Sequence, residues 1–133
     1  MQMLFHTFVS QEERRAFGGS DFLELQKCRL PAGTSQKELC SACMLTHWRL
    51  DSLYISGEEA IAFLALYGEI FGDGFYADGE SGKMDICGMQ YYTAEQTAQI
   101  IEGVKQKRPK EFQVLLDWLA EERTYNGIYL LGI

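Results

Sequence analysis

The residues whose types and spacing best suit chemistry are Cys40, Cys43 and His47. On a helix, the spacing i, i+3, i+7 places all three side chains on one face. Thiolate and imidazole are the preferred ligands of zinc, and a structural zinc site takes four ligands. Cys28 or Cys87 could supply the fourth ligand.

Two observations favour ordinary packing for this group. Cys-x-x-Cys occurs only once in the chain, and free cysteine is among the most frequently buried residue types. A redox motif would need Cys40 at the start of its helix, whereas Ser35-Gln36-Lys37-Glu38 predicts a helix that begins a turn earlier. We therefore expect core packing and no cofactor. A metal-dependent or thiol enzyme using Cys40, Cys43 and His47 is kept as an alternative.

Other catalytic signatures are absent from the sequence. It contains two histidines, no Gly-x-Ser-x-Gly motif, no phosphate-binding loop that ends in Lys-Ser or Lys-Thr, and no GxGxxG. Carboxylates are abundant, but an acidic domain places most of its carboxylates in solvent. The sequence therefore does not predict an enzyme.

The negative charge of the chain is concentrated in its middle. Residues 51–100 hold nine acids and one base, whereas residues 1–50 hold five acids and six bases and residues 101–133 hold five of each. The middle stretch therefore has a net charge of −8, while the two flanks have +1 and 0. Together they give the chain its net charge of −7. Eight of the 17 aromatic residues lie in the same stretch. Acids and aromatics together indicate a surface for a basic protein partner.

The centre of this surface is predicted to be a β-hairpin over about residues 72–91. Two apolar and aromatic runs, 72–77 and 83–91, are joined by the glycine-rich segment 78–82. Tyr76 lies between acids near the expected tip, where an exposed tyrosine could supply contact area. The predicted partner-binding residues are Asp73, Tyr76, Asp78, Glu80 and Asp85.

The remaining pattern predicts an α+β fold, a single domain over 1–133, with a mixed or antiparallel sheet. Capping boxes at Ser56 and Thr93 predict helix starts. The second of these helices and one that starts near Pro109 form an αα-hairpin over about residues 94–124. An apolar terminal strand over about residues 127–132 is expected to insert into the sheet.

Composition excludes several function classes. A pI near 4.8 disfavours binding to nucleic acid phosphates and to an anionic membrane surface. No apolar run reaches the ~18 residues of a membrane span. The first ten residues do not resemble a secretory signal, so a cytoplasmic location with reduced cysteines is expected.

In size, charge and lack of catalytic motifs, the chain is similar to the small acidic immunity proteins that neutralise bacterial nuclease toxins by covering a basic active site. No diagnostic motif of a family is matched. We therefore expect a small acidic cytoplasmic protein-binding domain of the immunity or inhibitor type. The competing interpretation is a structural or regulatory domain whose acidic face only maintains solubility.

Overall fold

The computed structural model describes residues 3–17, 21–41, 51–120 and 125–132. Its centre is a six-stranded antiparallel sheet with the order β2-β1-β6-β5-β3-β4. Together with the helices, this sheet confirms the α+β prediction, and the sheet is of the antiparallel kind. The strands are β1 (Phe22–Lys27), β2 (Leu53–Ser56), β3 (Gly74–Tyr76), β4 (Ser81–Gly82), β5 (Met89–Tyr92) and β6 (Ile128–Leu131).

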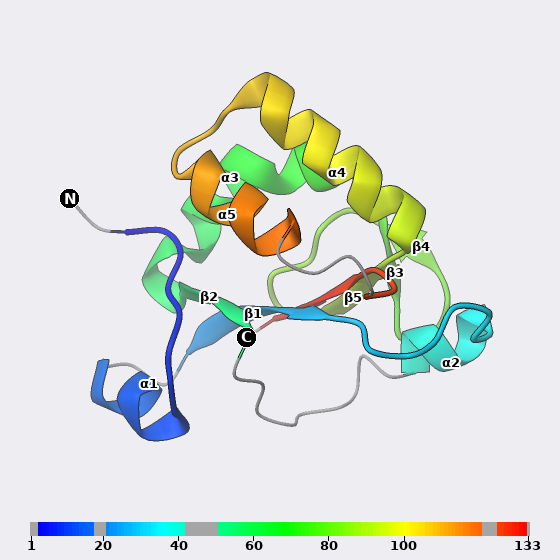
Figure 1. Ribbon diagram of the computed structural model, residues 1–133, viewed down its shortest axis with the longest axis horizontal. Helices are drawn as coiled ribbons and strands as arrows, with labels where there is room; N and C mark the ends of the chain where they lie inside the picture. Colours follow the sequence, from blue (N-terminus) through cyan, green and yellow to red (C-terminus); the bar gives the residue numbers. More distant parts are fainter. Residues whose placement is uncertain (1–2, 18–20, 42–50, 121–124, 133) are drawn as a thin grey trace.

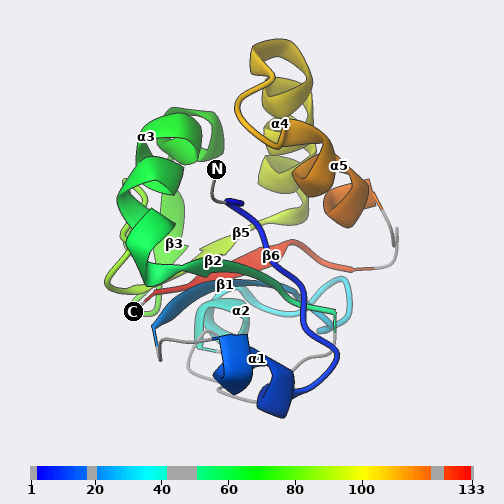
Figure 2. The same ribbon diagram turned by 90° about the vertical axis from the view of Figure 1, so that its left-hand side faces the viewer.

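Helices cover both sides of the sheet. On one side lie α3 (Ala60–Phe71), α4 (Ala94–Lys107) and α5 (Phe112–Ala120), as the view in Figure 1 shows. On the other side lie α1 (Gln11–Phe17) and α2 (Gln36–Ser41), which are seen below the sheet in Figure 2. The sheet is therefore the middle layer of the fold.

The last strand of the chain occupies the middle of the sheet. β6 pairs with β1 through the partners Leu25 and Leu130, and with β5 through Gln90 and Leu130. Ile128 and Leu130 have no exposed surface. This confirms the prediction that the terminal segment inserts into the sheet.

The main core lies between the sheet and the three helices α3, α4 and α5. Alternate strand residues such as Leu23, Leu25 and Tyr92 are buried there against the inner faces of the helices. The opposite face of the sheet holds two smaller clusters, one around Phe22 and Tyr54 and the other around Cys28, Leu39, Tyr91 and Tyr129.

Of the capping boxes predicted at Thr93 and Ser56, the first is formed and the second is not. The Thr93 hydroxyl accepts a hydrogen bond from the Gln96 amide at 3.0 Å, and the Gln96 side chain accepts one from the Thr93 amide at 2.8 Å. This capping box begins α4, and the αα-hairpin with α5 is confirmed as far as Ala120. Ser56 makes no side-chain capping bond, because a short 3-10 helix, Gly57–Glu59, precedes α3.

The predicted hairpin is present, since β3 pairs antiparallel with β5, but β3 also pairs with the two-residue β4 on its other side. The strand expected from residue 83 begins only at Met89. The reason is that the buried Gln90 side chain bonds the backbone here: Nε2 donates to the Gly82 and Lys83 carbonyls, and Oε1 accepts from the Asp85 amide.

Gly127, which leads into β6, provides a test of this arrangement. Its φ is +86°, and an added Cβ would collide with the Tyr92 carbonyl oxygen. We expect Gly127→Ala to lower the free energy of unfolding by more than about 2 kcal/mol, since the left-handed conformation alone costs alanine about 1–2 kcal/mol. Urea denaturation followed by circular dichroism measures this loss.

Gly33→Ala is the matched control. Gly33 has a similar φ of +91°, but nothing lies within 4 Å of an added Cβ. This variant should lose only the conformational part, about 1–2 kcal/mol. Equal losses in the two variants would contradict the close approach of Gly127 to β5.

Candidate functional site

The tip of the β3-β4 hairpin is closed by its own backbone. The Tyr76 amide donates to the Glu80 carbonyl at 2.7 Å, and the Gly79 amide donates to the Tyr76 carbonyl at 2.8 Å. Asp78 Oδ1 accepts from the Glu80 amide at 2.9 Å. The tip is thus a tight turn that holds its acidic side chains in defined positions.

Four of the predicted contact residues are exposed carboxylates. Asp73, Asp78, Glu80 and Asp85 all lie at the surface, with one exposed base, Lys83, among them. Within the described residues, none of the four makes an ion pair, whereas Asp51 is paired with Arg29. Their charge is therefore not neutralised by a close cation among those residues.

Tyr76 does not have the exposure expected for a contact residue. It is half-buried, its hydroxyl donates to the Lys83 carbonyl at 2.7 Å, and its ring lies directly against Gly82. The side chain therefore folds across the hairpin and ties β3 to the segment that follows β4. Its role as a binding residue stays a prediction, while its role in holding the hairpin is evident.

Sequence reasoning missed the residue that organises this surface, Gln90. Its side chain is completely buried and bonds the backbone of the loop that carries Asp85. The Asp85 carboxylate in turn accepts from the Cys87 amide at 2.9 Å. A usable signal was present, because alternation places Gln90 on the same strand face as the core residue Tyr92.

The other end of the hairpin is fixed to α4. The Gln96 side chain donates to the Asp73 carbonyl at 2.8 Å, so Asp73 lies beside the first turn of that helix. Below it, Tyr92 is buried, and its pKa is raised by desolvation and by the nearby Tyr76 and Asp73. Its hydroxyl therefore stays neutral beneath the acidic surface.

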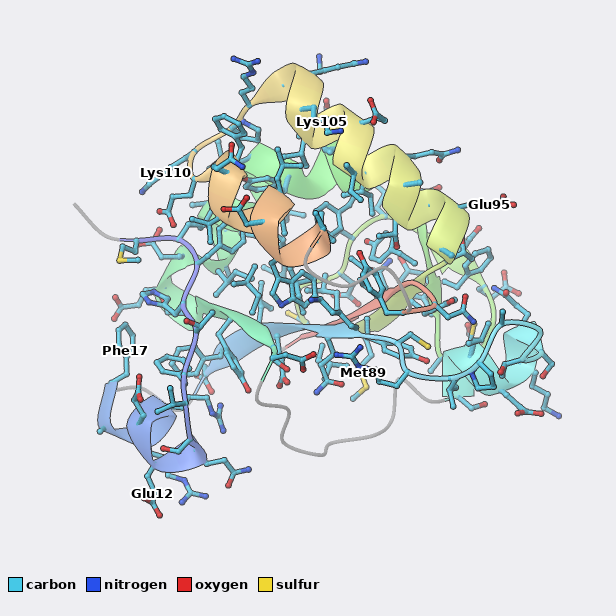
Figure 3. The ribbon with its side chains drawn as sticks, viewed as in Figure 1. Glu12, Phe17, Met89, Glu95, Lys105 and Lys110 are labelled. Atoms are coloured by element: carbon cyan, nitrogen blue, oxygen red, sulfur yellow. The ribbon has the colours of Figure 1, made fainter. Side chains whose placement is uncertain are left out.

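Charges of opposite sign lie at the two ends of α4. In Figure 3, Glu95 points outward from the end of α4 that adjoins the hairpin, while Lys105 is at the far end and Lys110 lies beyond it. Four bases, all exposed, occur at that far end, Lys105, Lys107, Arg108 and Lys110. The acidic hairpin is therefore well separated from the most basic part of the described surface.

Only part of the cysteine and histidine group can be placed. Cys43 and His47 lie outside the described residues. Cys40 is buried in α2, and its pKa is raised by desolvation and by the charge of Asp78. A nucleophilic thiol needs the opposite shift. Cys40 thus has the character of a packed thiol, and the hairpin tip lies close enough to α2 to influence it.

The remaining cysteines, Cys28 and Cys87, lie in different environments. Cys28 is buried, with its sulfur 3.4 Å from the Tyr129 hydroxyl, while Cys87 is exposed. Among the described residues, no three histidine, cysteine or acidic side chains are grouped so that they could hold a metal ion. The metal-dependent or thiol enzyme stays an untested alternative.

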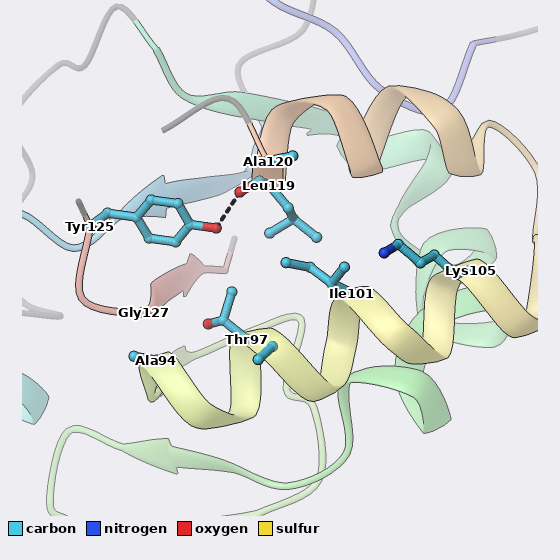
Figure 4. Close-up of a pocket in the computed structure, with 9 residues that line it drawn as sticks. Ala94, Thr97, Ile101, Lys105, Leu119, Ala120, Tyr125 and Gly127 are labelled. Carbon is cyan, nitrogen blue, oxygen red and sulfur yellow. Dashed lines mark hydrogen bonds between the residues drawn. The ribbon is translucent and has the colours of Figure 1, made fainter. Parts of the chain in front are cut away.

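A cleft lies between α4 and α5 and is shown in Figure 4. It has a volume of about 390 Å³. At one edge of the cleft, the Tyr125 hydroxyl donates to the Leu119 carbonyl. At the opposite end, Lys105 Nζ lies 3.5 Å from Glu102 Oε1. The nine lining residues include no acid, histidine or cysteine, and they are Ala94, Thr97, Ala98, Ile101, Lys105, Leu119, Ala120, Tyr125 and Gly127. This lining brings no acid–base or nucleophilic pair together.

Comparison with known proteins identifies no relative, since no family model, curated protein or solved structure significantly matches the chain. The described residues also include no helix of the length and apolarity needed to cross a membrane.

The electrostatic influence of Asp78 on Cys40 can be tested by alkylation of the two described cysteines that differ in exposure, Cys40 and Cys87. At mildly alkaline pH, iodoacetamide should modify exposed Cys87 faster than buried Cys40, whose raised pKa also reduces its thiolate fraction. Asp78→Asn removes the repelling charge, lowers the pKa of Cys40 and should speed its alkylation several-fold. Peptide mass spectrometry over time measures both rates.

Glu80→Gln is the matched control, because it removes one charge from the same turn and leaves Asp78, whose charge raises the pKa of Cys40, unchanged. Cys40 should then react at the wild-type rate. An equal response to both substitutions would contradict a specific influence of Asp78 on Cys40. Modification of Cys40 as fast as that of Cys87 would contradict the burial of Cys40.

Proposed function

We propose that this protein binds a basic protein partner through the acidic surface formed by the β3-β4 hairpin and the loop that follows it. An inhibitor or immunity-type protein, which covers a basic site of its partner, is the form of this function that the chain fits best. The supporting observation is a set of four exposed carboxylates, on a tightly bonded turn and loop, without an ion pair among the described residues.

Electrostatics explains why such a surface is suited to binding. Exposed charges of one sign attract an oppositely charged partner over about 10 Å at 0.1 M salt, which speeds the formation of the complex. The hydrogen bonds made by Asp78 and Asp85 to neighbouring amides hold the carboxylates in place. Little conformational entropy is then lost when a partner docks.

The chemistry of the described residues supports binding over catalysis. The carboxylates of the hairpin face solvent, and the raised pKa of Cys40 is the opposite of what a nucleophile needs. An acid–base pair in a water-excluding pocket would support an enzyme, and the cleft between α4 and α5 has no such pair among its lining residues.

The test is to capture a partner from cells that make the protein, at low salt, and to measure its association rate by surface plasmon resonance. Asp78→Asn with Glu80→Gln should lower that rate by about an order of magnitude at low ionic strength and flatten its dependence on salt. The fold should be unaffected, since both side chains are exposed.

The matched control neutralises two exposed acids elsewhere, Glu12→Gln with Glu13→Gln in α1. It changes the net charge equally but should leave the association rate near the wild-type value. Capture of no basic protein, or an equal loss of rate in the two double variants, would contradict the proposal.

A further inference from the structure

The outer face of α3 is unusually apolar for a surface helix. Glu69 is the only charged residue of the helix. Its inner face is buried through Ala60, Phe63, Tyr67 and Phe71. With 3.6 residues per turn, its remaining solvent-facing positions span an arc of about 140°. Four of them are exposed, Ile61, Ala65, Leu66 and Glu69, and Ala62 is half-buried.

The two large apolar side chains on this arc are open to solvent. Ile61 is 74% exposed and Leu66 is 37% exposed. Isolated apolar side chains are common on protein surfaces, but here they share one helix face with two alanines. A helix that is apolar on both sides is typically covered on both sides, and contiguous exposed apolar patches mark interaction sites.

The charges around this face indicate what covers it. Glu58 precedes the helix, Glu69 lies near the middle of the arc and Asp73 follows the helix, and all three are exposed. The chain has no lysine or arginine between residues 51 and 82, and Lys110 lies beside the inner face of α3, where its carbonyl accepts from the Tyr67 hydroxyl. A second copy of α3 would bring like charges together, and an anionic membrane would be repelled. A basic protein segment is complementary.

The acidic hairpin follows α3 directly in the chain and lies on the same side of the molecule. α3 ends at Phe71, and Asp73 and β3 follow directly. In Figure 2, α3 and the loop around β3 lie along the same side of the molecule. The exposed acids of the hairpin are polar, whereas protein interfaces combine an apolar centre with a polar rim. The α3 face supplies the part that the hairpin lacks.

We infer that the outer face of α3 is the apolar centre of the contact surface and that the hairpin acids form its rim. The partner it fits presents a row of apolar side chains flanked by lysine or arginine, as the face of a basic amphipathic helix does. This inference rests on the proposed function for the sign of the charge and adds where and how the partner is held.

A defined probe tests the inference without knowledge of the natural partner. A synthetic amphipathic helix of leucine and lysine is titrated into the labelled protein, and amide shifts are followed by NMR. We expect shifts over α3 and the hairpin, and no binding of the same peptide with glutamate in place of lysine. Ile61→Ser with Leu66→Ser should weaken binding of the lysine peptide about tenfold.

The control variant replaces two apolar side chains outside α3 by serine, and these side chains have nearly the same exposed fractions as Ile61 and Leu66. Val9 is 75% exposed and Val114 is 40% exposed, so Val9→Ser with Val114→Ser should bind the lysine peptide as the wild type does. Glu69→Lys keeps the apolar side chains and should also weaken binding. If the serine variant of α3 fails to fold, the binding of the Glu69→Lys variant tests the role of α3 in its place.

The outcomes separate the two proposals. Shifts confined to the hairpin would overturn the role of α3 and leave the proposed function standing. Shifts at neither element, or equal binding of the glutamate peptide, would overturn both. A dimer in sedimentation that is lost on Ile61→Ser with Leu66→Ser would show that a second copy covers the face, which also overturns the inference.

Discussion

The arrangement of the molecule depends on β6 lying between β1 and β5. On one side β1 continues to β2, and on the other β5 continues to β3 and β4, so among the described strands the two halves of the sheet are joined only through β6. Burying a side chain such as Ile128 or Leu130 contributes roughly 1.5–3 kcal/mol, against a total of about 5–15 kcal/mol for a typical domain. The position of the acidic hairpin relative to α2 therefore depends on a segment far from it in sequence.

A second constraint is the buried amide of Gln90. Its hydrogen bonds replace a strand pairing that the loop after β4 does not make, and they hold Asp85 at the surface. Tyr76 bonds the same loop from the other side through the Lys83 carbonyl. Two partly or fully buried polar side chains thus set the shape of a surface whose exposed charged groups are four acids and one base, Lys83. This explains how an acidic segment can be ordered despite the repulsion among its charges.

Features encoded locally could be predicted from the sequence. The capping box of Thr93 and Gln96 begins α4 through contacts within one helical turn. The apolar residues of β6 predict a buried strand, and β6 is mostly buried. Ser56 makes no capping bond because a 3-10 turn precedes α3, and the second hairpin strand is shorter than predicted because the buried Gln90 side chain bonds the loop before it. The acids were found from charge density alone. The apolar outer face of α3 could not be predicted, because the sequence alone does not say whether an apolar helix residue is buried or exposed.

The central claim is that one side of the molecule, α3 together with the β3-β4 hairpin, meets a basic partner. Hydrogen–deuterium exchange of the protein with and without a partner captured at low salt tests it most directly. We expect slower exchange over residues 60–85 in the complex and unchanged exchange in α1 and at the basic end of α4. Protection confined to residues 105–112 or to α1, with residues 60–85 unchanged, would contradict the claim.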